Sequence, residues 1–174
     1  MRIVSSFFIA GIITSMVVSP AEAQFDGRVS VEPYVGYGFF GDLPDTSFTL
    51  ESDFALGGRV AYRITPQWSA FGNFQRSTPS DVNVDHWSAG VEFSYVPRGG
   101  AEGMLPILIE AGLGQARYES GPSDLAVNLG LASALQLSPN FAIRYGANDY
   151  ISNYNGGNGI VNQIFVQVGA ELRF

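Results

Sequence analysis

Several features that stabilise or anchor exported proteins are missing from this sequence. It contains no cysteine, so it forms no disulfide and offers no cysteine for lipoprotein acylation. All 9 of its Lys and Arg residues are arginines, so it also contains no lysine. The absence of lysine is unusual for a protein surface that faces water. Beyond the first two dozen residues there is no apolar run near the roughly 18 residues of a membrane-spanning helix. Disulfide-stabilised folds and helical membrane domains are therefore excluded.

The first 23 residues have the organisation of a secretory signal peptide. Arg2 precedes an apolar stretch that breaks at Pro20, and the small-residue sequence AEA, typical of a cleavage site, follows it. An uncleaved anchor helix is the alternative, but the apolar stretch is short and contains a proline. We therefore predict a cleaved signal peptide over residues 1–23 and a single domain over residues 24–174.

Eight segments of that domain alternate between apolar residues and small or polar ones. The mean hydropathy of the chain, +0.12, is high for a soluble protein. Alternation over about ten residues, with turn residues between the segments, is typical of β-strands that face two environments. The sequence thus predicts an all-β fold of eight antiparallel strands. The expected strands cover residues 28–40, 54–64, 68–76, 84–96, 105–116, 125–137, 141–148 and 161–174.

The connections between these segments are expected to alternate in length. Barrels of the bacterial outer membrane have short periplasmic turns, longer outer loops and an even strand number. That pattern predicts an up-and-down barrel with both termini on the periplasmic side. The expected short links cover residues 65–67, 97–104 and 138–140, and the expected long loops cover residues 41–53, 77–83, 117–124 and 149–160.

The chemistry of the two strand faces distinguishes a membrane barrel from a soluble barrel of the lipocalin kind. The non-apolar face is mostly glycine, alanine and serine with isolated charges, which suits a crowded lumen better than a wet exterior. The apolar face carries aromatic residues at both strand ends, as the two girdles of a membrane barrel would. The expected girdles are Tyr62, Trp68, Tyr95, Phe141 and Phe174 near the short turns, and Tyr37, Phe39, Phe54, Phe74 and Trp87 near the long loops.

The domain resembles the small eight-stranded outer-membrane barrels of the OmpA/OmpX type. The most specific part of the resemblance is the final segment, which alternates from Ile164 onward and ends on the aromatic Phe174. In that superfamily such a strand is the signal read by the barrel assembly machinery. The resemblance implies an integral outer-membrane protein whose last strand closes on the first, with lipid and lipopolysaccharide as its surroundings.

Eight charged residues fall on the face expected to point into the lumen. Buried charges persist only when they are paired, and an eight-stranded barrel is just wide enough for side chains to fill it. We therefore expect an ion-pair network that plugs the lumen, and the alternative is a narrow pore gated by exchange of the pairs. The expected network consists of Glu32, Glu92, Glu110 and Glu171 with Arg59, Arg63, Arg144 and Arg173.

One group of residues could carry catalysis. His86 and Ser88 lie two residues apart, with Glu92 further along the same face, and a nucleophile needs a base and an orienting group within reach. An outer-membrane lipid A deacylase uses a similar His-x-Ser pair with a Glu. There, however, the pair lies late in the chain and faces lipid, whereas here it is mid-chain and shares the lumen face. A wall histidine is therefore the preferred interpretation.

Other ligand sites are weakly indicated. The acidic pairs Asp42/Asp45 and Glu51/Asp53 lack an EF-hand spacing, so solvated loop charge is preferred over a divalent-cation site. No phosphate loop, zinc pattern or basic patch occurs, so we expect no cofactor and no nucleic-acid partner. The sequence as a whole predicts a monomeric, non-enzymatic outer-membrane barrel with acidic outer loops and a structural or surface-interaction role. A pore, a lipid A-modifying enzyme and an adhesin are the alternatives.

Overall fold

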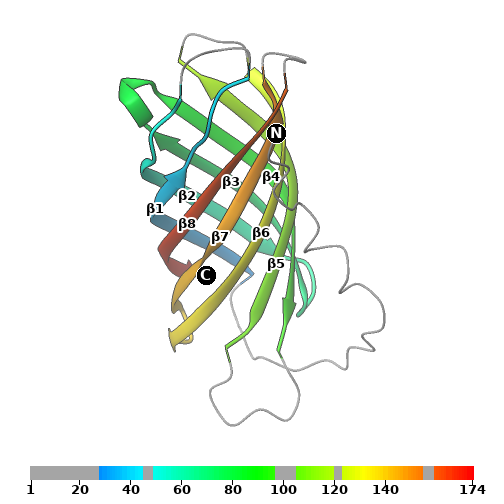
Figure 1. The fold of residues 1–174 in the computed structure, drawn as a ribbon. Coiled ribbons are helices and arrows are strands. Elements are labelled where there is room, and N and C mark those ends of the chain that lie inside the picture. The colour runs from blue at the N-terminus through cyan, green and yellow to red at the C-terminus, as the bar shows by residue number, and fades with distance from the viewer. Residues whose placement is uncertain (1–27, 45–48, 97–104, 120–122, 155–158) are drawn as a thin grey trace.

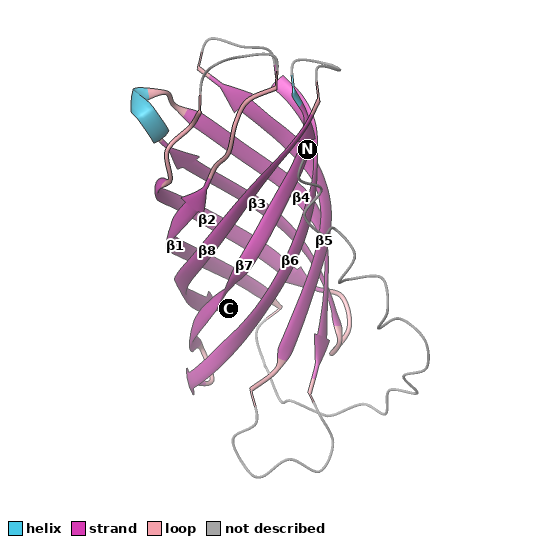
Figure 2. Cartoon of the chain, viewed as in Figure 1, coloured by secondary structure: helices cyan, strands magenta, loops and turns pink. Residues whose placement is uncertain are grey.

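Eight antiparallel strands close into a barrel in which each strand pairs with its neighbours in sequence (Figure 1). The computed structural model describes residues 28–44, 49–96, 105–119, 123–154 and 159–174. Apart from one short 3-10 helix, Pro79–Asp81, the named elements are all strands (Figure 2). No helix in these ranges is long and apolar enough to cross a membrane. The strands are β1 (Val29–Phe39), β2 (Asp53–Arg63), β3 (Trp68–Ser77), β4 (Val84–Tyr95), β5 (Ile107–Tyr118), β6 (Ser123–Ser138), β7 (Phe141–Asn153) and β8 (Ile160–Arg173).

The eight-stranded antiparallel barrel predicted from the sequence is confirmed, with differences at strand ends. β7 continues to Asn153 rather than stopping at residue 148, because polar residues beyond the apolar band still pair with β6 and β8. The connection between β4 and β5 runs from residue 96 to 106, whereas that between β5 and β6 spans only residues 119–122. The sequence predicted a short link between β4 and β5 and a long loop between β5 and β6, and this prediction was wrong for both connections. The predicted signal peptide, residues 1–23, lies outside the described residues.

The two faces of the barrel wall are separated as the alternation predicted. In β1 the side chains of Ser30, Glu32 and Tyr34 are buried in the lumen, whereas the intervening Val31 and Val35 are exposed. The same alternation runs through β8, where residues of one parity are buried and those of the other are exposed. An apolar exterior around a polar interior is the arrangement of a membrane barrel rather than a lipocalin.

Below, the end of the barrel where β1 begins and β8 ends is called the terminal end, and the opposite end is the distal end. At the terminal end the Phe174 amide donates to the carbonyl oxygen of Val29 at 2.9 Å, and the Val29 amide donates back at 3.3 Å. The ladder continues along the strands, for example where Val35 faces Val168. The final residues therefore complete the closure of the sheet.

We predict that Val168→Arg destabilises the folded barrel in a bilayer by about 2–4 kcal/mol, because Val168 faces lipid near the middle of the wall. Ile160→Arg is the matched control. Ile160 lies on the same face at the distal end of β8, where the cost of a charge falls to about 0–1 kcal/mol. Urea unfolding in lipid vesicles measures both values, and equal losses at the two positions would contradict the lipid-facing assignment.

Candidate functional site: the filled lumen and the outer wall

Five buried charged side chains from five strands meet in the middle of the lumen and are called the central cluster (Glu32, Arg59, Glu92, Glu110 and Arg144). The Arg59 Nη2 lies 2.7 Å from Glu92 Oε2 and 3.1 Å from Glu110 Oε1. Arg144 Nη2 contacts the same two oxygens at 2.6 and 2.7 Å. Glu32 Oε2 completes the group, 3.4 Å from Arg144 Nε and 3.9 Å from Arg59 Nη1. Each arginine thus contacts all three carboxylates.

The strand register explains why each of the two arginines contacts more than one carboxylate. Glu92 and Glu110 are direct cross-strand partners, and like charges in that arrangement repel each other. Arg59 and Arg144 reach this pair from β2 and β7 and lie against both carboxylates. Charges taken out of water are tolerated only with such close partners. The central cluster therefore acts as one unit rather than as independent pairs.

The remaining three residues of the predicted network lie nearer the terminal end, and the Glu171 carboxylate also interacts electrostatically with Arg144 and Arg59 of the central cluster. Arg173 holds the Glu171 carboxylate through two hydrogen bonds, of 3.0 and 2.9 Å. Arg63 is half-buried and interacts electrostatically with both of them. The structure therefore divides the eight predicted residues into the central cluster and this terminal group, because sequence parity gives the face of a residue but not its height in the lumen.

A layer of hydrogen-bonded aromatic and amide side chains lies on the distal side of the central cluster. The Tyr34 hydroxyl donates to Asn73 Oδ1 at 2.9 Å, and Asn73 Nδ2 donates to the Tyr150 hydroxyl at 2.7 Å. The His86 Nε2 hydrogen bonds to Gln163 Oε1, and Gln163 Nε2 donates to the Tyr118 hydroxyl at 2.9 Å. These chains of contacts cross the lumen from strand to strand and fill it. This layer was not predicted from the sequence, because it contains no charged residue that would mark it.

His86 and Ser88, the residues considered for catalysis, both lie in this layer and are buried. The His86 ring packs on Tyr150 and Phe165, with centroid separations of 4.7 and 5.2 Å. The hydrogen bonds that the structure describes join His86 to Gln163 and do not join it to Ser88. The described contacts of His86 are therefore ring packing and a hydrogen bond to Gln163, and they do not place it as a base for Ser88.

An apolar lid covers the distal mouth of the lumen. The segments that follow β1 and precede β2 carry Leu43 and Leu50, which are buried together with Val84, Tyr118 and Val161. An isolated bridge between Asp42 and Thr49 holds the two segments against each other, and the Thr49 hydroxyl donates to Asp42 Oδ1 at 2.6 Å. Residues 41–53 were predicted only as a long outer loop, although two leucines in an acidic segment were a signal of burial.

Two of the acidic loop residues accept hydrogen bonds from neighbouring loop residues. Asp42 accepts the Thr49 hydroxyl, and Asp53 Oδ2 accepts the Thr78 amide at 3.0 Å. Asp45 lies outside the described residues. Within the described ranges no three His, Cys, Asp or Glu side chains are placed to hold a metal ion.

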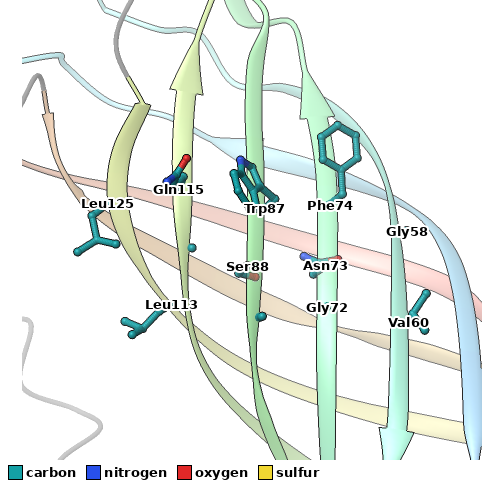
Figure 3. A pocket seen from close by; sticks show the side chains of 12 residues that line it. Gly58, Val60, Gly72, Asn73, Phe74, Trp87, Ser88, Leu113, Gln115 and Leu125 are labelled. Carbon is teal, nitrogen blue, oxygen red and sulfur yellow. The ribbon is translucent and has the colours of Figure 1, made fainter.

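A shallow hollow of about 720 Å³ lies on the outward face of β2 to β6. Its floor contains the small residues Gly58, Gly72 and Ala89. The side chains of Phe74, Trp87, Leu113 and Leu125 line it (Figure 3). The hollow is therefore a feature of the outer wall and is separate from the filled lumen.

We predict that Arg144→Ala costs about 3–5 kcal/mol of folding free energy, because it leaves buried carboxylates without a counter-charge. Arg28→Ala, at an exposed position outside the strands, is the control and is expected to change stability by less than about 0.5 kcal/mol. Unfolding in urea measures both. A loss at Arg144 no larger than that at Arg28 would show that the central cluster does not act as a unit.

A second prediction concerns Tyr34, whose direct partners on both neighbouring strands are glycines, Gly57 and Gly169. A Cβ at position 57 would collide with the Tyr34 ring, so Gly57→Ala is expected to cost about 1–3 kcal/mol through overpacking. Gly72→Ala is the control, because a Cβ there meets nothing within 4 Å. The same urea measurement compares the two, and equal effects would contradict a tightly packed lumen.

Comparisons with known proteins identify the fold and no closer relationship. No protein-family model matches the sequence, and no curated protein matches it.

Solved structures match it over most of both chains. The Neisserial surface protein A has a TM-score of 0.64 and 13% identity, covering 84% of this chain and 97% of its own. The N-terminal β-barrel domain of Pseudomonas aeruginosa OprF has a TM-score of 0.54 and 14% identity, covering 84% and 99%. Ail, the attachment invasion locus protein of Yersinia pestis, has a TM-score of 0.51 and 19% identity, covering 85% and 99%. The chain therefore has the fold of the small eight-stranded outer-membrane β-barrels.

Proposed function

We propose that the protein is a non-conducting, non-enzymatic outer-membrane barrel that serves a structural or surface-interaction role. The observation that carries this proposal is the filling of the lumen at three successive levels. From the terminal end to the distal end these are the central cluster, the aromatic and amide layer, and the apolar lid. With the interior closed, the outer wall and the distal loops are the surfaces left for function.

A narrow pore is the second candidate, and one feature of the central cluster favours it. Each arginine contacts both Glu92 and Glu110, so the pairs could exchange and open a path between them. The lid argues against this function, because Leu43 and Leu50 bury an apolar cluster across the mouth that an ion would have to cross. A filled interior is also what eight strands allow.

The lipid A-modifying enzyme is the weakest candidate. Its nucleophile would need access to a lipid substrate and a base within hydrogen-bond reach. Ser88 and His86 instead face the lumen and are buried beneath the lid. The Nε2 of His86, which would have to take the proton, is engaged by Gln163. These contacts support a non-enzymatic protein.

The proposal includes an orientation, with both termini periplasmic and the distal end at the cell surface. The acidic residues Asp42, Glu51 and Asp53 lie at that distal end, where they would face outward on a monomer. At the other end the Phe174 side chain is exposed on the lipid-facing side of the final strand, as a signal for the barrel assembly machinery requires. Outer-membrane lipid and lipopolysaccharide are the partners proposed for the wall.

We predict that the unmodified protein is almost silent in planar bilayers, because the cluster and the lid close the lumen independently. Leu50→Ser opens only the lid and is expected to stay silent, whereas Leu50→Ser combined with Arg144→Ala is expected to conduct intermittently. Single-channel recording distinguishes these cases. Steady, ion-selective channels from the unmodified protein would reject the closed-lumen function and favour the pore.

A further inference from the structure

The hydrogen-bond ladder between β1 and β8, the first and last strands, which lie side by side (Figure 1), is interrupted in its middle. Its register pairs Val31 with Leu172 and resumes with Tyr34 and Gly169, and the two residue pairs between them are missing. The ladders of the other neighbouring strands, all within the described residues, run without an interior gap. The ladder between β6 and β7 shifts its register only near the terminal end. Among the described strands, the interrupted ladder is therefore the seam that closes the barrel.

Pro33 is the cause of this gap. Val29 and Phe174 exchange two backbone hydrogen bonds, and such pairs recur at every second residue of an antiparallel ladder. Pro33 occupies one of these positions, and the register places it opposite Ala170. Because proline has no amide N–H, the Ala170 carbonyl oxygen lacks its ladder donor. Proline is ordinarily confined to edge strands and bulges for this reason, and a closed barrel has no edge strand.

The gap lies deep in the wall rather than at the membrane surface. Val31 and Val35 are exposed on the lipid-facing side, before and after Pro33 in β1. On the inward side Glu32, the chain neighbour of Pro33, belongs to the central cluster. A Cβ at Gly169 on the opposite strand would lie 2.6 Å from Glu32 Oε1, so this carboxylate lies directly against the seam. Hydrocarbon offers no donor to replace the missing one. The weakest part of the seam thus lies between lipid and the central cluster.

We propose that the barrel wall opens locally at this seam, between residues 31–35 of β1 and 168–172 of β8, while the rest of the sheet stays paired. Opening there breaks fewer hydrogen bonds than opening an equal length of a continuous ladder, and the least stable segments of a protein open most often. The open state connects the lipid phase laterally with the Glu32 carboxylate. The aromatic and amide layer and the apolar lid stay in place, so this opening creates no path along the barrel axis and goes beyond the proposed function.

Amide hydrogen exchange, followed by NMR on the full mature chain refolded in zwitterionic micelles, tests the proposal. The amide of Phe174 donates to β1 and that of Arg173 donates to Asn140 beside β7. Even-numbered residues of β8 therefore report on the seam, and odd-numbered residues report on the continuous ladder with β7. We expect the protection factors of Ala170 and Leu172 to be about tenfold lower than those of their odd-numbered neighbours.

Restoring the donor should close the seam. Pro33→Ala supplies an amide opposite Ala170 and is expected to raise the protection of Ala170 and Leu172 about tenfold. Removing a proline also makes the unfolded chain more flexible, which lowers global stability, so a local rise in protection is not a global effect. Val35→Ala is the matched control, because it lies on the same face of β1 and keeps its amide. This control should not raise the protection.

A disulfide across the seam gives a second, independent measurement, because the chain has no cysteine of its own. Val35→Cys with Val168→Cys spans the seam, and Tyr145→Cys with Val168→Cys spans the ladder between β7 and β8 from the same position. Oxidation of the first pair is expected to raise the protection of Ala170 and Leu172 about tenfold. Oxidation of the second pair should leave it unchanged.

Heat-modifiable migration confirms that each variant is folded before its exchange is measured. Equal protection of even- and odd-numbered amides of β8 in the unmodified protein, or no gain with Pro33→Ala, would overturn the local opening. Equal effects of the two disulfides would place the motion outside the seam and overturn it as well. Because the exchange measurement needs neither a membrane orientation nor a closed lumen, its failure is distinguishable from failure of the proposed function, which the bilayer recordings test.

Discussion

The constraint on which the whole structure depends is the satisfaction of every backbone hydrogen bond inside a medium that offers none. In hydrocarbon a sheet meets this requirement only when it closes on itself. Here the closure lies between β1 and β8, and the last residue takes part in it, since Phe174 and Val29 exchange both of their backbone hydrogen bonds. Phe174 therefore has a backbone partner in β1 and belongs to the seam that closes the barrel.

Closure with eight strands fixes the width of the lumen, and the width fixes the side chains that it accepts. Two long arginines and three glutamates fill the centre because their charged ends converge on shared oxygens. Where a large ring points into the lumen, the adjacent strands carry small residues beside it. Tyr34 has glycine as its neighbour on either side, and a Cβ at Gly169 would lie 2.8 Å from the Tyr34 Cβ. The small residues of the inner face are thus complements of specific large ones.

The sequence predicted the strand number, the pairing order and the face of each residue, because all three follow from a period of two and a preference for apolar surface in lipid. It did not predict which lumen charges meet. Glu171 and Glu110 share a face, but the stagger of the strands places Glu171 with Arg173 near the terminal end and Glu110 in the central cluster. Leu43 and Leu50 were missed because burial of a loop depends on the mouth beneath it, which local pattern does not describe.

Because the lumen is filled at several levels, the outer wall and the distal loops are the surfaces that can contact other molecules. The outer wall is uniform in hydropathy but uneven in shape and charge, since Gly72 and Ala89 hollow it beneath Arg76 and Arg117. Lipid packs against an even apolar wall without preference. Arg76 is paired with Asp85 on the outer face and Arg117 lies on the strand opposite the same carboxylate, so the charges at this rim compensate one another.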